Sequence, residues 1–163
     1  MKIVKIVLLI LVVLMVVIQF IRPGKNTPSA TGNAGQSSFP TDVRNVLERS
    51  CYDCHSNTTK YPWYAEVQPV GWWLAGHISD GKKEINFDEF ANYRPRRQYR
   101  KLTEIEEQIN ENEMPLPSYL WVHRDAELSP ENRTALITWV NNMKDSMKAI
   151  YPIDSLERRP TRQ

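Results

Sequence analysis

The distribution of apolar residues divides the chain into four parts. Residues 3–21 are nearly all aliphatic and are interrupted only by Lys5 and Gln19. Residues 22–40 are rich in Pro, Gly, Asn, Ser and Thr, with almost no large apolar side chain before Phe39. Because such a composition cannot bury a core, we expect a flexible linker over residues 23–40. A globular domain is expected over residues 41–151, and a polar tail over residues 152–163.

The N-terminal apolar stretch has the length of a membrane-spanning segment. At about 1.5 Å of rise per residue, it would cover most of a hydrocarbon core of about 30 Å. The sequence therefore predicts a transmembrane anchor over residues 1–22. A cleaved secretory signal is the alternative, because the uninterrupted run from Ile6 to Ile18 suits its apolar core. No Ala-x-Ala cleavage site follows directly, which favours an uncleaved anchor.

Apolar residues recur at helical spacing in several segments of the domain. They predict helices over residues 41–54, over residues 70–78, around Leu102 to Ile109, and from Pro130 onward. The last helix is the clearest, because Ser129 can cap it and Pro130 suits its first position. No strong strand pattern appears around residues 41–60, and we expect an all-α fold. The last helix should pack across the apolar face of the first, formed by Val43, Val46 and Leu47.

Two thiols and an imidazole stand together in Cys51-Tyr52-Asp53-Cys54-His55. This is the attachment pattern of c-type haem. Positions i and i+3 share one face of a helical turn, so both sulfurs can reach one porphyrin edge and form thioethers with its vinyl groups. His55 can then bind the iron through a neutral ring nitrogen. We predict one covalent haem c, attached at Cys51 and Cys54, with His55 as an axial iron ligand.

Other interpretations of the two cysteines remain open. A thioredoxin-like dithiol would sit on the turn of a βαβ unit. A zinc site needs four ligands, which would require His77 and His123 as well as the cysteines. A structural disulfide across two residues would be strained.

Met114 is the predicted sixth ligand of the iron. It stands in Met114-Pro115-Leu116-Pro117, where the prolines fix the backbone beside the sulfur. A Met opposite a His is a known pair of haem ligands. His77 is the alternative sixth ligand, and the nearby Trp72 and Trp73 are candidates for packing against the flat apolar porphyrin. We expect His123 to be a structural or surface residue.

Charge and composition narrow the range of partners. Charged residues make up 25% of the chain and the formal net charge is +2, so nothing indicates a nucleic-acid binder. Both cysteines belong to one motif, which excludes a disulfide scaffold. A basic cluster at residues 94–101 could pair with haem propionates or with an acidic electron partner, although such runs are more often solvated faces.

Five stretches of the chain form a distinctive set: residues 50–57, 61–64, 68–74 with His77, 86–90 and 113–119. With this set the chain resembles the bacterial haem-binding-domain family of Bacteroidetes, which are small membrane-anchored proteins related to c-type cytochromes. The resemblance implies covalent haem at Cys51 and Cys54, with His55 as an axial ligand. It leaves Met114 and His77 as alternatives and implies no particular physiological role.

Together these features predict a cytochrome c-like helical domain around one haem, behind a single transmembrane helix. The expected function is single-electron transfer by a mono-haem c-type cytochrome that is not an enzyme. The protein would lie in the inner membrane as a single-pass protein, with the haem domain in the periplasm. Its redox partner would be a respiratory complex, an oxidase or a peroxidase. A haem sensor or enzyme with an open iron site, or a non-haem subunit of a membrane complex, is the alternative.

Overall fold

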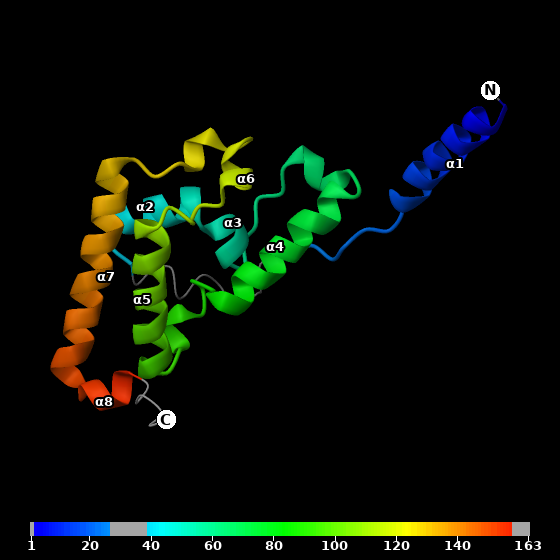
Figure 1. The fold of residues 1–163 in the computed structure, drawn as a ribbon. Coiled ribbons are helices and arrows are strands. Elements are labelled where there is room, and N and C mark those ends of the chain that lie inside the picture. Colours follow the sequence, from blue (N-terminus) through cyan, green and yellow to red (C-terminus); the bar gives the residue numbers. More distant parts are fainter. Residues whose placement is uncertain (1, 27–38, 158–163) are drawn as a thin grey trace, which may run out of the picture.

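The computed structural model describes residues 2–26 and 39–157, and within these ranges it contains helices and loops but no strand. The prediction of an all-α fold is therefore confirmed. The longer helices are α1 (Lys2–Ile18), α2 (Thr41–Ser50), α4 (Val70–Glu84), α5 (Pro95–Asn110) and α7 (Pro130–Ile150) (Figure 1). The shorter ones are α3 (Tyr52–His55), η2 (Trp63–Glu66), η3 (Phe90–Asn92), α6 (Pro117–Leu120), η4 (Arg124–Ala126) and α8 (Ile153–Leu156).

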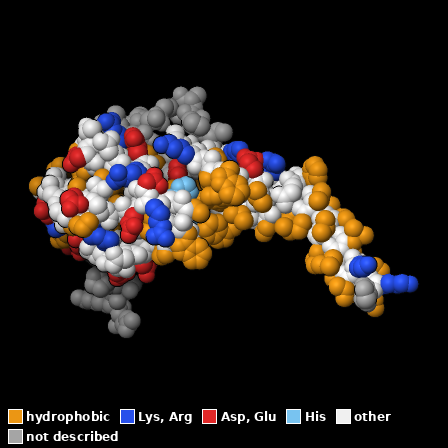
Figure 2. All heavy atoms as spheres, turned by 90° about the horizontal axis from the view of Figure 1, so that it is seen from above, with side chains coloured by type: hydrophobic (Ala, Val, Ile, Leu, Met, Phe, Trp, Pro, Cys, Tyr) orange, Lys and Arg blue, Asp and Glu red, His pale blue; other side chains and the backbone are white. Residues whose placement is uncertain are grey.

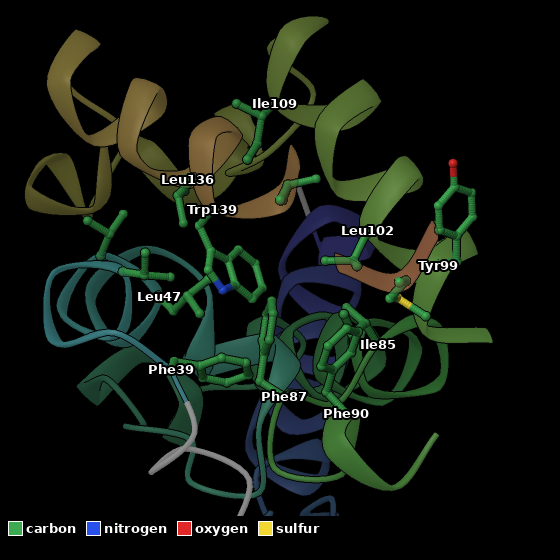
Figure 3. Packing of buried hydrophobic residues seen from close by; sticks show 14 of the residues in the cluster. Phe39, Leu47, Ile85, Phe87, Phe90, Tyr99, Leu102, Ile109, Leu136 and Trp139 are labelled. Carbon is green, nitrogen blue, oxygen red and sulfur yellow. The ribbon is translucent and has the colours of Figure 1, made fainter. Parts of the chain in front are cut away.

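The hydrophobic core lies between α2, α5 and α7. Helices α5 and α7 run side by side, and α2 packs against α7 (Figure 1). Leu47, Leu102 and Leu136 belong to this core and are at most 1% exposed (Figure 3). Phe39 meets Trp139 edge to face, with ring centroids 5.4 Å apart. The predicted packing of the last helix on the apolar face of the first is confirmed.

The start of α7 follows the predicted capping. The Ser129 hydroxyl accepts a hydrogen bond from the Asn132 backbone N–H at 3.2 Å, and Pro130 occupies the first helical position. This satisfies one of the free N–H groups at the helix end.

The predicted first helix is broken inside the attachment motif. Helix α2 ends at Ser50, Cys51 leaves helical geometry at φ −130°, and α3 begins at Tyr52. The backbone N–H groups of Cys54 and His55 donate back to the Cys51 carbonyl, at 3.2 and 3.0 Å. The break turns Tyr52 into the core, where it packs on Phe87 with ring centroids 5.6 Å apart.

Helix α4 runs past its predicted end. The sequence predicts a helix over residues 70–78, because Asp80-Gly81 has the composition of a helix end, yet the helix continues to Glu84. Position 81 requires glycine, because a Cβ there would lie only 2.8 Å from the Cys54 carbonyl oxygen and would clash with it. The glycine therefore marks a close approach between α4 and α3.

The N-terminal helix does not fulfil the predicted role of a membrane anchor. Helix α1 has 17 residues with exposed aliphatic side chains along its length, as Figure 2 shows. At about 1.5 Å per residue it is about 25 Å long, shorter than a hydrocarbon core of about 30 Å. Among the described residues, no helix has both the length and the apolar content needed to cross a membrane. The predicted transmembrane helix over residues 1–22, and with it the predicted single-pass location in the inner membrane, is therefore wrong.

Residues 19–26 form a strap along the body instead of continuing the apolar helix. The Gln19 side chain exchanges two hydrogen bonds with the Gln68 backbone, at 3.1 and 2.9 Å. Trp72 donates its indole N–H to the Ile21 carbonyl at 2.7 Å. Most of the predicted linker lies outside the described residues. In the predicted polar tail, α8 forms, and Leu156 is buried in the core.

Candidate haem site

The attachment motif is held between α4 and the loops that follow the motif. Helix α3 packs against α4, and their contact is closest at Gly81 and Cys54 (Figure 1). Both cysteines are free thiols and half-buried. Burial raises the pKa of Cys51 to about 12 and that of Cys54 to about 11, so both thiols are neutral at pH 7.

The His55 ring is oriented by two main-chain carbonyls of α4 and its C-terminal end. Its Nδ1 lies 2.9 Å from the Gly81 oxygen and 3.2 Å from the Ile85 oxygen. A carbonyl can only accept, so Nδ1 carries the proton and Nε2 carries the lone pair. Burial lowers the pKa of His55, which keeps the imidazole neutral at pH 7. A neutral imidazole with one nitrogen fixed and the other free is the form that ligates a metal.

Residues 86–88 clamp the chain immediately after His55. The Phe87 N–H donates to the His55 carbonyl at 2.8 Å, and the Asn57 N–H donates to the Asp88 carboxylate at 2.6 Å. The Asn86 side chain donates to Asn57 Oδ1 at 2.9 Å. This segment has no helical periodicity, yet it fixes the direction in which the chain leaves the motif.

Asp53, between the two cysteines, is tied to both flanking loops. Its carboxylate accepts from the Lys60 N–H at 3.0 Å and from the Tyr119 hydroxyl at 2.8 Å, while its carbonyl accepts from Thr59 at 2.7 Å. Tyr119 belongs to α6, so this bond brings the segment after Met114 against α3. Burial, with the Asp53 bond as a further cause, raises the pKa of Tyr119.

His123 lies in the same polar region rather than at an isolated surface position. Its Nε2 is 2.7 Å from the Tyr64 hydroxyl, and its ring stacks on Tyr119 with ring centroids 4.2 Å apart. Beside these rings is an open pocket of about 420 Å³ between α2, α3, α6 and η4. The sequence predicts a structural or surface role for His123, and no local pattern connects this residue with the motif.

Trp73 and His77 lie on α4, before the turn of the helix that approaches the motif. Positions 73, 77 and 81 are four apart and follow one stripe of the helix, whose Gly81 end faces Cys54. The Trp73 and His77 rings contact each other with centroids 4.2 Å apart. Trp72 stands about two and a half turns before Gly81, hence on the opposite side, against Ile21 of the strap.

Met114 is half-buried at the end of α5, and its N–H donates to the Gln108 carbonyl at 3.3 Å. Arg133 of α7 fixes the turn before it by donating to the Ile109 carbonyl and, at 2.7 Å, to the Asn112 side chain. Asn112 has φ 58°, in the left-handed region, which that bond supports. The turn is therefore held in place, but these contacts do not assign Met114 to the iron.

Within the basic cluster at residues 94–101, Lys101 is buried and pairs inside the fold, whereas the four arginines lie on the surface. Lys101 is 4% exposed and pairs with Glu84 at 2.7 Å and with Glu104 at 2.5 Å. Arg97 stacks over the Tyr93 ring at 3.8 Å, and Arg96 donates to the Glu157 carbonyl at 2.7 Å. These contacts give the suggested pairing with haem propionates no support.

Comparison with known proteins decides the family. Residues 13–142 match the family described as haem-binding domain. The chain belongs to the haem-binding domain family. The predicted membership of a haem-binding-domain family is thus confirmed, and haem is the cofactor that this match supports. No curated protein and no solved structure matches the chain.

The residues of the motif fit a haem, whereas the other interpretations find less support. Two free thiols adjoin an imidazole that keeps Nε2 as its metal-binding atom. A redox dithiol needs a lowered thiol pKa, and both values here are raised. Within residues 2–26 and 39–157, no three His, Cys, Asp or Glu side chains gather as a metal site, so zinc gains no support.

Several residues shape the site although the sequence did not predict that role for them. They are Gly81 and Ile85, which orient His55, the clamp residues Asn86 and Asp88, and the Tyr64–Tyr119–His123 group. Most of them stand in or beside the stretches that carry the family resemblance, which was the available signal.

Proposed function

We propose that this haem-binding domain attaches one haem covalently through Cys51 and Cys54 and transfers single electrons. The orientation of His55 is the observation that supports this most strongly. Its Nδ1–H is held by two main-chain carbonyls, so Nε2 is left for iron beside two free thiols. Each thiol would add its S–H across one vinyl group of haem, forming a thioether without loss of any atom.

The chain's own residues would provide attachment, orientation and a fixed ligand. When bound, the haem supplies an iron that changes its charge by one electron. The carbonyls of Gly81 and Ile85 would keep the His55 ring from rotating, because Nδ1 can leave them only by losing both contacts. A ligand that stays in place needs little reorganisation when the electron arrives. We propose an electron carrier for a redox partner protein rather than an enzyme.

Whether a side chain occupies the sixth position of the iron distinguishes electron transfer from ligand binding. Met114 remains the predicted ligand, with His77 as the alternative on the stripe of α4 that leads to Cys54. Either would give a six-coordinate low-spin iron suited to electron transfer. An open position would instead suit a sensor or an enzyme.

The test is expression of the full chain together with a c-type haem assembly system. We expect an intact mass larger than the polypeptide by one haem, a pyridine haemochrome spectrum typical of thioether-bound haem, and a low-spin absorption spectrum. The Cys51→Ala and Cys54→Ala variants should each keep one thioether or none, and the double variant should keep none. A protein with only its polypeptide mass and no Soret band would refute the proposal.

A further inference from the structure

A polar group beside the motif is left unused by the proposed function. Its members, here called the His123 group, are Asp53, Tyr64, Tyr119 and His123. The His123 ring is 2.7 Å from the Tyr64 hydroxyl and stacks on Tyr119, which donates to Asp53 at 2.8 Å. Asp53 directly precedes Cys54. Two contacts therefore link a titratable imidazole to the attachment motif.

His123 has access to solvent and faces a mixed set of charges. It is half-buried and lines the open pocket of about 420 Å³. Three carboxylates and two cations line this pocket. The titratable and charged groups that face it are Glu48 and Arg49 of α2, Asp53 of α3, Lys60 and Tyr61 of the following loop, Tyr64 of η2, Tyr119 of α6 and Asp125 of η4.

The Tyr64 hydroxyl lets the imidazole change its charge without losing its partner. A hydroxyl both donates and accepts, so it can donate to the neutral ring and accept from the protonated ring. Burial, followed by the nearby Asp53 and Cys54, raises the pKa of Tyr64, so the hydroxyl keeps its own proton at neutral pH. The 2.7 Å hydrogen bond can therefore persist in both protonation states.

We propose that His123 takes up a proton from solvent when the haem iron accepts an electron from a one-electron donor. The inference rests on the proposed function, because it requires a haem attached at Cys54. Reduction removes one positive charge from the attached group, and Coulomb attraction then favours a new positive charge nearby. Coupling between two binding events is reciprocal, so protonated His123 makes the iron easier to reduce. Electron uptake is thereby accompanied by proton uptake at a residue that does not touch the iron.

The test is a redox titration of the haem-loaded full chain between pH 5 and pH 8, where imidazoles ordinarily titrate. We expect the midpoint potential to fall as the pH rises. A tenfold change in a one-electron equilibrium corresponds to about 59 mV. Reduction should raise the pH at which His123 is half protonated. The total fall in midpoint potential should be about 59 mV for each pH unit of that rise. The His123→Gln variant should lose this pH dependence.

Two further measurements separate His123 from its neighbours. Asp125→Asn is the matched control in the same pocket, because aspartates ordinarily titrate near pH 4, so the pH dependence should remain. Ring-proton NMR of the wild type should show His123 taking up its proton at a higher pH in the ferrous than in the ferric protein. Because this measurement needs no variant, it tests the inference even if His123→Gln fails to fold.

The outcomes distinguish this inference from the proposed function. A pH-independent potential in the haem-loaded wild type, an unchanged slope in His123→Gln, or His123 titration that is identical in both oxidation states overturns the inference alone. Absence of thioether-bound haem, or of a reversible one-electron couple, overturns both.

Discussion

At the scale of single residues, Gly81 decides how closely α4 can approach the motif. A Cβ at this position would meet the Cys54 carbonyl oxygen at 2.8 Å and the Cys54 Cβ at 3.2 Å. Main-chain atoms cannot move aside without displacing α3. The same residue supplies the nearer of the two carbonyls that hold His55. The glycine therefore controls both the packing of the motif and the orientation of its imidazole.

We predict that Gly81→Ala lowers the free energy of unfolding by about 1–3 kcal/mol, because the two helices must separate. Haem incorporation should fall with it. Gly76→Ala is the matched control in the same helix: nothing lies within 4 Å of a Cβ there, so it should raise stability by about 0.5–1 kcal/mol. Urea denaturation followed by tryptophan fluorescence measures both changes. Equal effects at the two positions would refute the role of close packing.

The sixth ligand is also decided by single residues. Met114→Ala should lower the reduction potential or convert the haem to a high-spin form, because the iron loses a thioether ligand that raises the potential. His77→Ala should leave the spectrum in place. Visible absorption and redox titration of the two haem-loaded variants are the measurements. The opposite pattern would assign the ligand to His77.

The motif could be predicted from the sequence at this scale, but its surroundings could not. Cys51, Cys54 and His55 carry a local signal, because the chemistry requires those side chains at that spacing. Asp53 stands at a position that the motif leaves open, yet its bonds to Lys60 and Tyr119 organise the loops. Contacts between residues that are far apart in the sequence produce no periodic pattern from which they could be predicted.

At the scale of elements, the predicted and observed helices agree best where the sequence pattern is most regular. Helix α7 combines a capping serine, a proline at its first position and a repeating apolar stripe. Helix α4 was predicted too short because Asp80-Gly81 has the composition of a helix end. Residues 85–90 were poorly patterned because Ile85, Phe87 and Phe90 enter the core from an irregular segment. There the burial of each side chain depends on tertiary contacts rather than on helical spacing.

The cap of α7 can be tested directly. Ser129→Ala should lower the free energy of unfolding by about 1 kcal/mol, since the Asn132 N–H loses its acceptor. Ser146→Ala, an exposed position within the same helix, should change stability by no more than about 0.5 kcal/mol. Guanidinium denaturation compares the two variants. A loss at Ser146 as large as that at Ser129 would argue against the cap.

At the scale of the whole molecule, the N-terminal strap joins α1 to the haem domain. Asn26 is its main contact: its side-chain amide donates to the Ser56 carbonyl and to Thr59, both at 2.8 Å. Lys82 of α4 donates to Oδ1 of the Asn26 side chain at 2.6 Å. One residue therefore connects the strap, the loop after the motif and α4. The apolar composition up to Ile21 concealed this, because no local pattern indicates that α1 ends at Ile18 or that the Gln19 side chain bonds to the Gln68 main chain.

We predict that Asn26→Ala lowers the free energy of unfolding by about 1–3 kcal/mol, because it removes three hydrogen bonds, two of them to the loop after the motif. Lys25→Ala is the control in the adjacent position. Its ion pair with Glu66 is exposed, so the loss should stay within about 1 kcal/mol. Hydrogen exchange at residues 56–60 should accelerate in the first variant only. Similar exchange in both variants would contradict the role of Asn26.

The clamp at residues 86–88 implies an order of events during synthesis. When Cys51 to His55 leave the ribosome, residues 86–88 have not yet emerged from it. At roughly 5–20 residues per second, the missing stretch of about thirty residues takes a few seconds to appear. For that interval the chain after His55 lacks the hydrogen bonds that later fix its direction. If the haem is attached covalently as proposed, its delivery would compete during this time with oxidation of the two thiols.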